Sequence, residues 1–329
     1  MKGIILCAGA GTRLYPITRL YPKTLIPVAN IPLLQSCIEK LIEQNIVDIG
    51  IVIHPSQESA IREHIGTGEQ WGTTITYIYQ NKPRGISDAV KETRHFVGEE
   101  SFLLLLGDNL IIDSLTELKE LLEQGSHAGL LLAEVDTPQD YGIAEVFNQQ
   151  IIKLVEKPCI PTSNLAVMGA YAFTSSIFQA VSAIGPSVRG EYEITDAIQW
   201  LIDQGYPVTY RLTVKQNMDV GTIKRWLEAN RRSLSQMEES RLIHESVKLD
   251  NCQIIAPVAI DKNCVLKDCV IGPYVSISAG STIEGCQIKN CIILNDVHLK
   301  DVNYYLEDTV IGFRSIMAGL HSLGREGDQ

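Results

Sequence analysis

The sequence has no excess of positive charge. It contains 28 Lys and Arg residues against 39 Asp and Glu residues, which gives a formal net charge of −11 at pH 7. The acidic residues are spread along the chain rather than gathered in a tail. Because nucleic acids and anionic membranes attract basic surfaces, this balance argues against both as partners. A site for a polyphosphate would therefore depend on a few local cations and a metal ion.

The cysteines lack the spacing of a disulfide framework or a zinc site. Eight are present, none in a Cys-x-x-Cys pair, and five of them lie between Cys252 and Cys291. The first residues form too short an apolar run for a signal peptide. No apolar stretch approaches the roughly 20 residues that a membrane-spanning helix needs. We therefore expect a reduced, cytoplasmic protein.

The apolar pattern of the first 237 residues predicts an α/β catalytic domain. Short apolar runs alternate with helical periodicity, which is typical of a Rossmann-like, mixed but mostly parallel sheet with helices on both faces. The expected strands are Gly3–Leu6, Ile49–Ile53, Thr74–Tyr79 and Phe102–Leu106, and the expected helices are Leu33–Gln44, Glu58–Ile65, Ser87–Phe96 and Gly221–Met237. Ligands of such sheets bind at the carboxyl ends of the strands, so the loops after Leu6, Tyr79 and Leu106 are the first candidates.

A different period begins after a polar connector at residues 238–245. Aliphatic residues recur there at steps of five or six, at Ile260, Leu266, Ile271, Ile277, Ile283, Ile288, Ile293 and Leu299. This period is too short for a helical repeat and predicts a short left-handed parallel β-helix over residues 246–329, with about three strands per coil and about four coils. Its cysteines would then face inward as small apolar side chains rather than bind a metal.

A loop with two glycines follows the first expected strand. Gly9 and Gly11 allow backbone amides to approach an anion. The loop is not a Walker loop, because Gly-Lys-Ser/Thr is missing, and it is not a complete dinucleotide fingerprint, because Leu14 replaces the third glycine. Two cations follow, Arg13 and Lys23, and four nearby prolines stiffen the segment that carries Lys23.

Two motifs in this region resemble the signature of the sugar-1-phosphate nucleotidyltransferases. They are Gly-x-Gly-Thr-Arg-Leu-x-Pro at residues 9–16 and Pro-Lys-x-Leu-Ile-Pro-Val at residues 22–28. Over essentially its whole length the chain is most similar to glucose-1-phosphate thymidylyltransferases of the long type, which carry a C-terminal left-handed β-helix. Members of the family join a nucleoside triphosphate to a sugar 1-phosphate and release pyrophosphate. The resemblance implies that Arg13 grips the leaving phosphates and that Lys23 bridges the α-phosphate.

The resemblance also implies a magnesium ion and a nucleotide pocket. Asp108 and Asp219 match the family's metal ligands, although an Asp after a buried strand is often only a turn residue. Gln80 offers both a donor and an acceptor to the edge of a pyrimidine base. The implied nucleotide contacts are Leu6, Ala8, Gly9, Gly11, Thr12, Gln80, Gly85 and Asp88.

A sugar-phosphate site is implied by later motifs. Glu156 would accept sugar hydroxyls, and Lys157 would neutralise the sugar phosphate. The chain departs from the family at Asn217, where Trp is common, and at Cys7, where Ala or Ser is commoner, so the sugar stays open. The implied sugar-phosphate contacts are Asn109, Tyr141, Gly142, Glu156, Lys157, Val167, Tyr171 and Arg189.

Two alternatives to a nucleotidyltransferase stay open at this point. A regulatory or nucleotide-exchange subunit of the same architecture would have lost charged groups, whereas both catalytic cations and both acids are present. An acyltransferase activity of the β-helix would use His298 and Asn295, but so few coils leave little room for coenzyme A. We expect dTTP and glucose 1-phosphate as substrates, with UTP next, and a homo-oligomer because the short β-helix has ends and faces to cover.

Overall fold

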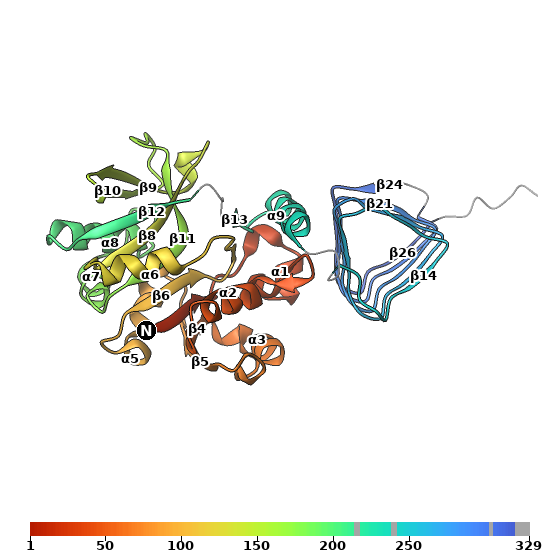
Figure 1. Cartoon of the computed structure of the whole chain (residues 1–329), viewed down its shortest axis with the longest axis horizontal. Helices are drawn as coiled ribbons and strands as arrows, with labels where there is room; N and C mark the ends of the chain where they lie inside the picture. The colour runs from red at the N-terminus through yellow and green to blue at the C-terminus, as the bar shows by residue number, and fades with distance from the viewer. Residues whose placement is uncertain (214–217, 238–241, 303–304, 320–329) are drawn as a thin grey trace, which may run out of the picture. The chain divides into compact units, whose positions relative to one another are not determined.

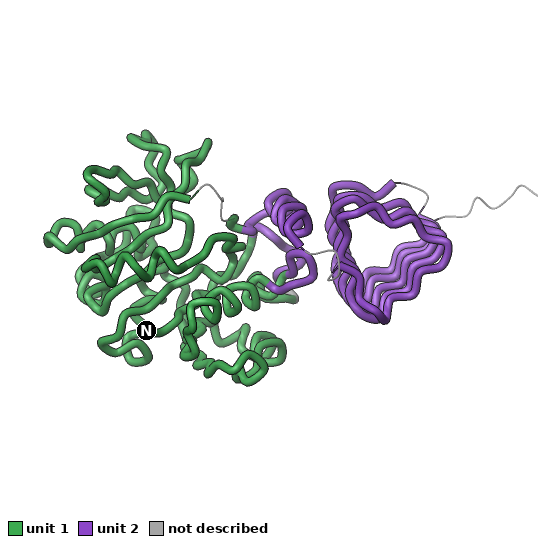
Figure 2. Tube along the Cα trace, in the orientation of Figure 1, with its two compact units in different colours: residues 1–12, 21–26, 33–219 green, residues 13–20, 27–32, 220–329 purple. Residues whose placement is uncertain are grey.

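The chain forms two compact units, coloured green and purple in Figure 2. The computed structural model describes residues 1–213, 218–237, 242–302 and 305–319. The first unit comprises residues 1–12, 21–26 and 33–219, and the second comprises residues 13–20, 27–32 and 220–329. Two short N-terminal segments therefore belong to the unit that contains the C-terminal third of the chain. The division of the chain into 1–237, 238–245 and 246–329 stays a proposal, and residues 238–241 lie outside the described residues.

A nine-stranded mixed sheet forms the centre of the first unit, in the order β5-β4-β1-β6-β11-β8-β12-β10-β9 (Figure 1). Neighbours among β5, β4, β1 and β6 are parallel, as are β8 and β12, whereas β11 and β10 run against their neighbours. The strands are β1 (Lys2–Leu6), β4 (Asp48–Ile53), β5 (Thr74–Tyr79), β6 (Phe102–Leu106), β8 (Ala128–Glu134), β9 (Gly142–Phe147), β10 (Gln150–Glu156), β11 (Leu165–Phe173) and β12 (Val208–Leu212). The predicted Rossmann-like, mostly parallel α/β fold is confirmed.

Helices cover both faces of this sheet because successive strand residues point to opposite sides. Ile5 packs in one core with α2, α3 and α6, and Ile4 packs in a second core with α4, α5, α7 and α8. The helices are α2 (Leu33–Ile42), α3 (Glu58–Ile65), α4 (Ile86–Glu92), α5 (Arg94–Val97), α6 (Thr116–Glu123), α7 (Ile177–Ala183) and α8 (Ile194–Asp203). No helix in the described parts of the chain is long and apolar enough to cross a membrane.

Three parallel sheets of five, four and four strands form the β-helix of the second unit. Their orders are β14-β17-β20-β23-β26, β15-β18-β21-β24 and β16-β19-β22-β25. The strands are β14 (Lys248–Asp250), β15 (Gln253–Ile254), β16 (Val258–Ile260), β17 (Val265–Lys267), β18 (Val270–Ile271), β19 (Val275–Ile277), β20 (Thr282–Glu284), β21 (Gln287–Lys289), β22 (Ile292–Ile293), β23 (His298–Lys300), β24 (Tyr305–Glu307), β25 (Val310–Ile311) and β26 (Ile316–Ala318). This arrangement fits the predicted left-handed parallel β-helix.

The interior of the β-helix holds the aliphatic ladder that the sequence predicts. Leu266, Ile283 and Leu299 lie in register on successive coils, and each is at most 1% exposed. Four cysteines are buried in the same core, at positions 264, 269, 286 and 291. They act there as small apolar side chains, as predicted.

One sheet of the β-helix packs against α9 (Ile223–Gln236) through a buried amide. The side-chain oxygen of Asn230 accepts hydrogen bonds from Ser276 Oγ at 2.9 Å and from the backbone N–H of Ala29 at 2.8 Å. Trp226 on the same helix donates from its indole nitrogen to the carbonyl of Pro27 at 2.6 Å. The helix is thus bonded to both the β-helix and residues 27–32.

Residues 27–32 also bond directly to the β-helix. They form a hairpin of β2 (Pro27–Val28) and β3 (Ile31–Pro32). Asn30 in its turn donates from Nδ2 to the carbonyls of Ala259 at 3.2 Å and Ile277 at 3.0 Å. Its Oδ1 accepts from Ser278 Oγ at 3.1 Å. A single asparagine from the N-terminal region therefore holds two coils of the β-helix.

Candidate functional site

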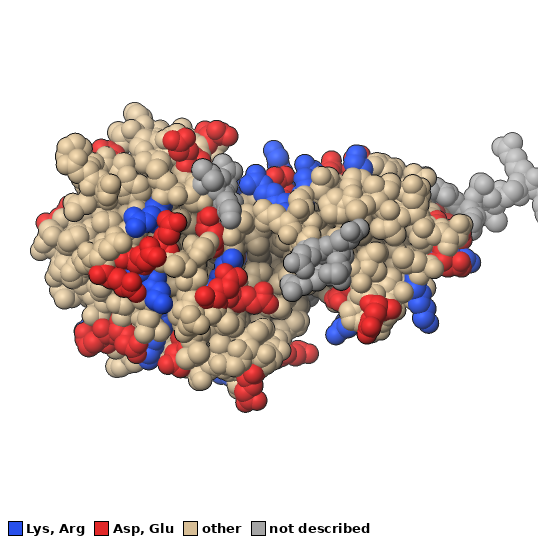
Figure 3. Space-filling model, in the orientation of Figure 1, with Lys and Arg blue, Asp and Glu red and all other residues tan. Residues whose placement is uncertain are grey.

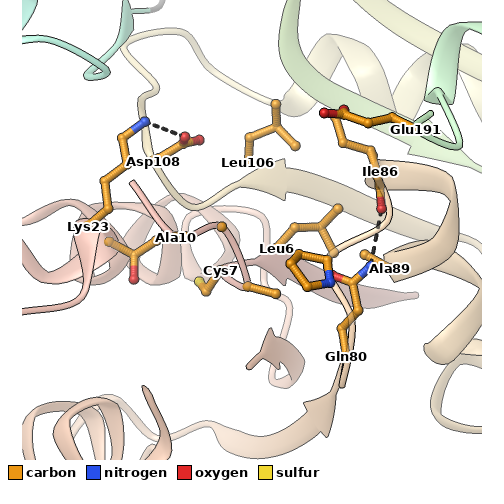
Figure 4. Close-up of a pocket in the computed structure, with 15 residues that line it drawn as sticks. Leu6, Cys7, Ala10, Lys23, Gln80, Ile86, Ala89, Leu106, Asp108 and Glu191 are labelled. Carbon is orange, nitrogen blue, oxygen red and sulfur yellow. Dashed lines mark hydrogen bonds and ion pairs between the residues drawn. The ribbon is translucent and has the colours of Figure 1, made fainter. Parts of the chain in front are cut away.

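A cavity of about 390 Å³ lies in the first unit where β1, β5 and β6 end (Figure 4). Three loops contribute most of its wall, and they are the loops after Leu6, Tyr79 and Leu106 that the sequence singled out. The lining residues are Leu6, Cys7, Ala8, Gly9, Ala10, Lys23, Thr24, Gln80, Pro83, Gly85, Ile86, Ala89, Leu106, Asp108 and Glu191. A volume of this size suits a small organic ligand.

The parallel strands bring these loops to one edge of the sheet. Leu6 pairs with Val52 on one side and with Leu106 on the other. The backbone N–H of Cys7 then donates to the carbonyl of Val52 at 2.7 Å, and that of Gly107 to the carbonyl of Leu6 at 2.9 Å. These bonds fix the first residues of both loops, so the ladder of the sheet positions the cavity.

Lys23 is held between two carboxylates at this edge. Its Nζ lies 2.5 Å from Asp108 Oδ2 and 3.0 Å from Asp219 Oδ1. The lysine side chain is 7% exposed, and Figure 4 shows it pointing toward Asp108. Burial lowers the pKa of Lys23, but the two carboxylates outweigh this effect and raise it above its ordinary value. The lysine is therefore a fixed cation.

A short antiparallel pairing brings the second acid to the first. β13 (Met218–Asp219) pairs with β7 (Asn109–Leu110), so that Asp219 stands opposite Asn109, next in the chain to Asp108. Among the residues that the structure describes, no group of three or more His, Cys, Asp or Glu side chains could hold a metal ion. Two carboxylates do fit Mg²⁺, which in nucleotide sites takes its remaining ligands from phosphates and water.

Gln80 has a fixed orientation in the cavity wall. Its Nε2 donates to Asp88 Oδ2 at 2.8 Å and to the carbonyl of Gly85 at 3.2 Å. A carboxylate accepts only, so the nitrogen must face Asp88, and both amide hydrogens are then used. The amide oxygen is the group that Gln80 can offer to a ligand. Asp88 is buried, is also paired with Arg84 at 2.7 Å and does not line the cavity itself.

Gly85 is required by the backbone of another loop. A Cβ at this position would lie 2.5 Å from the carbonyl oxygen of Tyr192, and its φ of +118° is one that only glycine adopts readily. Tyr192 in turn donates from its backbone N–H to the carbonyl of Arg84 at 2.8 Å. The absent side chain thus lets the segment around Tyr192 pack on the Gln80 loop, which the sequence did not indicate.

Five of the predicted sugar-phosphate residues form one cluster. Arg189 Nη1 lies 3.4 Å from Glu156 Oε1, and Lys157 Nζ lies 3.8 Å from the same oxygen. The backbone of Lys157 donates to the carbonyl of Tyr141 at 3.0 Å. Gly142 faces Glu156 too, since a Cβ there would lie 3.1 Å from Oε2. A carboxylate with two cations is suited to bind hydroxyls beside a phosphate.

The remaining predicted residues lie in several places. Gly11 and Thr12 do not line the cavity, and Arg13 belongs to the second unit, where its side chain is exposed. Asn109 is buried, and its backbone carbonyl accepts a weak hydrogen bond from Cys37. Asn217 lies outside the described residues.

Val167 and Tyr171 belong to the core behind the sheet. The Tyr171 ring stacks on Phe173 with 5.6 Å between centroids, and burial raises the pKa of its hydroxyl. The side chain is 4% exposed, and Val167 is 8% exposed. Their predicted role at a sugar stays a prediction.

Several lining residues were missed by the sequence reasoning. Glu191 lies two positions after Arg189, which the resemblance implied as a sugar-phosphate contact, so its neighbourhood was found but not its side chain. Thr195, which does not line the cavity, was missed too and donates to Glu156 Oε2 at 3.2 Å. Ala10 and Ala89 carry no chemical signal and are found only from the folded structure.

Comparison with known proteins shows which family has a sequence like this one. Residues 2–236 match the family described as nucleotidyl transferase. The chain is similar to the low-salt glycan biosynthesis nucleotidyltransferase Agl11 of Haloferax volcanii, with 37% identity over 305 residues, covering 86% of this chain and 85% of the relative. It is also similar to the glucose-1-phosphate thymidylyltransferase of Streptomyces griseus, with 35% identity over 300 residues, covering 86% and 84%.

A solved structure shows the same likeness. It is the crystal structure of a candidate glucose-1-phosphate thymidylyltransferase from Bacillus anthracis in complex with sucrose. The two chains are 36% identical with a TM-score of 0.67, and the match covers 72% of this chain and 96% of the other. Together with the family match over most of the sequence, this likeness shows that the chain belongs to the nucleotidyl transferase family and is a nucleotidyltransferase.

Proposed function

We propose that this protein transfers a nucleotidyl group from dTTP to glucose 1-phosphate, forming a nucleoside-diphosphate sugar and releasing pyrophosphate. The observation that carries the proposal is Lys23, a buried cation fixed between two carboxylates in the wall of a nucleotide-sized cavity. The sugar and the base are supported by the thymidylyltransferase relatives, with UTP as the second choice.

The reaction is an in-line attack by a sugar-phosphate oxygen on the α-phosphorus of the nucleotide. Two anionic groups must approach each other, so the protein has to neutralise and align them. Lys23 would contact the α-phosphate, while Lys157 and Arg189 would hold the sugar phosphate. The attacking oxygen is already ionised at neutral pH, so no general base is needed. Arg13 is proposed to bind the leaving phosphates.

A magnesium ion is part of the proposal. Asp108 and Asp219 would be its protein ligands, and the ion would supply further charge neutralisation at the phosphates. Neither carboxylate could hold the nucleotide alone, because both repel phosphate. Lys23 Nζ lies within 3.0 Å of both carboxylates. The carboxylates would therefore bind the magnesium ion while the adjacent lysine binds a phosphate.

The orientation of the Gln80 amide favours a thymine or uracil base. Its free amide oxygen accepts a hydrogen bond, and both bases carry an N–H donor at N3, whereas cytosine has an acceptor there. Pro83, Leu106 and Ala89 give the cavity an apolar wall suited to a base. Among pyrimidine nucleotides, this polarity favours dTTP and UTP over CTP.

A pyrophosphate-release assay tests the proposal. The intact chain with Mg²⁺ is mixed with each pair from a grid of nucleoside triphosphates and sugar 1-phosphates. The highest rate is expected with dTTP and glucose 1-phosphate. Lys23→Ala should lower the rate about 10²- to 10³-fold, whereas Lys40→Ala, which removes a lysine of α2 paired with Glu43, should not. No pyrophosphate with any pair would instead support the regulatory subunit.

A further inference from the structure

A second cavity, of about 590 Å³, lies within the second unit between α9 and the β-helix. It shares no lining residue with the cavity at the sheet edge. Its size falls in the range of small-molecule sites, roughly 300–1,000 Å³. Nothing in nucleotide transfer requires it. Its walls differ in charge, and this difference indicates the class of ligand.

The wall formed by α9 is positively charged. Lys224, Glu228 and Arg231 follow at helical spacing along one face, with Arg232 beside them, while the opposite face of α9 is buried. Glu228 lies 2.8 Å from Arg232 and 3.8 Å from Arg231. One carboxylate is therefore shared by two arginines on a wall that also carries Lys224. Figure 3 shows blue Lys and Arg atoms gathered over this helix.

The wall formed by the β-helix carries hydrogen-bond acceptors. Asn290 is 5% exposed, and its Nδ2 donates to the carboxylate of Asp308. That bond fixes the amide, because a carboxylate accepts only. Asn290 Oδ1 has no hydrogen-bond partner in the described structure. This oxygen has almost no accessible surface, so the acceptor that this wall presents to a ligand is the exposed carboxylate of Asp308.

We propose that this cavity binds a phosphorylated sugar or polyol. The phosphate would lie against Lys224 and Arg231, and the hydroxyls would donate to the carboxylate of Asp308. The Arg231 guanidinium lies 5.5 Å from the centroid of the Tyr274 ring, which restrains it on the cavity side of the helix. Asp308 disfavours ligands that are anionic along their whole length.

Calorimetric titration of the intact protein with glucose 6-phosphate tests this inference. The wild-type chain should bind it, and should not bind glucose, which lacks the phosphate. Lys224→Ala and Arg231→Ala should each weaken binding about tenfold, the effect of losing one charge-assisted hydrogen bond. Lys262→Ala removes an exposed lysine of the same unit outside the cavity and should leave binding unchanged.

A variant in the first unit separates this site from the proposed sugar site. Lys157→Ala should retain binding of glucose 6-phosphate. Loss of binding in that variant would assign the ligand to the Glu156 cluster and overturn the inference, as would binding of glucose with equal affinity. Absence of binding to the wild-type protein overturns it too. Because Lys224→Ala should keep its pyrophosphate release, failure of this inference leaves the proposed reaction untouched.

Discussion

Lys23 occupies the position between two acids that a metal ion would also favour. Asp108 and Asp219 would repel each other without a cation, and Nζ meets both. In the protein without nucleotide, the lysine therefore balances one of the two negative charges. A magnesium ion must compete with it, unless the nucleotide draws the ammonium group toward phosphate. We infer that the metal binds weakly to the free protein and more tightly with nucleotide.

Removal of this lysine should change metal binding in the opposite direction to activity. Lys23→Ala should bind free Mg²⁺ more tightly than the wild-type protein, because the lysine then no longer competes with the metal ion for the two carboxylates. Titration calorimetry with MgCl₂, without nucleotide, measures the affinity. Equal or weaker binding in Lys23→Ala would contradict the competition. Lys40→Ala is the control, since it removes the same charge from α2.

The charge on Lys23 should also be visible in the pH dependence of catalysis. Its pKa is raised above the ordinary value of about 10.4, so the ammonium form persists as the pH rises. The second pKa of a phosphate monoester is about 6. We expect kcat/KM to rise to a plateau above that pH and stay level up to about pH 10. A fall between pH 8 and pH 9 would show that the lysine is less strongly held.

Asp88 should control which base the protein accepts. It holds the nitrogen of Gln80 at 2.8 Å and so leaves the oxygen for the ligand. In Asp88→Asn the amide of Gln80 can turn over, because the new side chain both donates and accepts. The ratio of kcat/KM for dTTP to that for CTP should fall about tenfold, the effect of one hydrogen bond. An unchanged ratio would rule out Asp88 as a positioning residue.

At the scale of elements, Gly85 precedes α4 and lies against the backbone of Tyr192. A side chain here must displace backbone atoms 2.5 Å away. Gly85→Ala should therefore lower stability by about 3 kcal/mol and raise KM for the nucleotide, since strain and overpacking act together. Gly72→Ala is the control: φ is also positive there, at +68°, but no atom lies within 4 Å of the added Cβ. It should cost about 1 kcal/mol and leave KM unchanged. Urea unfolding and steady-state kinetics measure both.

The long elements were predictable from local pattern. The apolar run Phe102–Leu106 and the ladder from Ile260 to Leu299 each lie where periodicity placed them. The predicted helix Ser87–Phe96 is divided into α4 and α5, because Thr93 turns its hydroxyl back to the carbonyl of Val90 at 2.7 Å. Such side-chain bonds compete with the helix at a single residue. Propensity averaged over a segment does not resolve them.

The candidate site was predictable only in part. The loops after Leu6 and Leu106 follow from a parallel sheet, but the meeting of Asp108 and Asp219 depends on the pairing of β7 with β13, which has only two residues in each strand. No spacing in the sequence encodes that pairing, and resemblance supplied the two acids. Asp88 shows the converse: the resemblance implied that it contacts the nucleotide, yet in the structure it contacts Gln80 and does not line the cavity.

At the scale of the whole molecule, Asn30 bonds an N-terminal hairpin to the β-helix. Asn30→Ala would leave two carbonyls and a serine hydroxyl without their partner, which should cost about 1–3 kcal/mol. Asn45→Ala is the matched control, since Asn45 has a similar positive φ of 60° but is exposed. The difference in free energy of unfolding between the two variants isolates the bonds to the β-helix. Equal losses would mean that only the backbone conformation matters.

The bonds of Asn30 also set an order of events during synthesis. Asn30 and Ser278 are separated by 248 positions in the sequence. A ribosome that adds roughly 5–20 residues per second needs about 12–50 s to make that interval. For this time the nascent hairpin lacks its hydrogen-bonding partners, which lie at β16 and at the end of β19. These hydrogen bonds therefore form late in synthesis, only after residue 278 has been added.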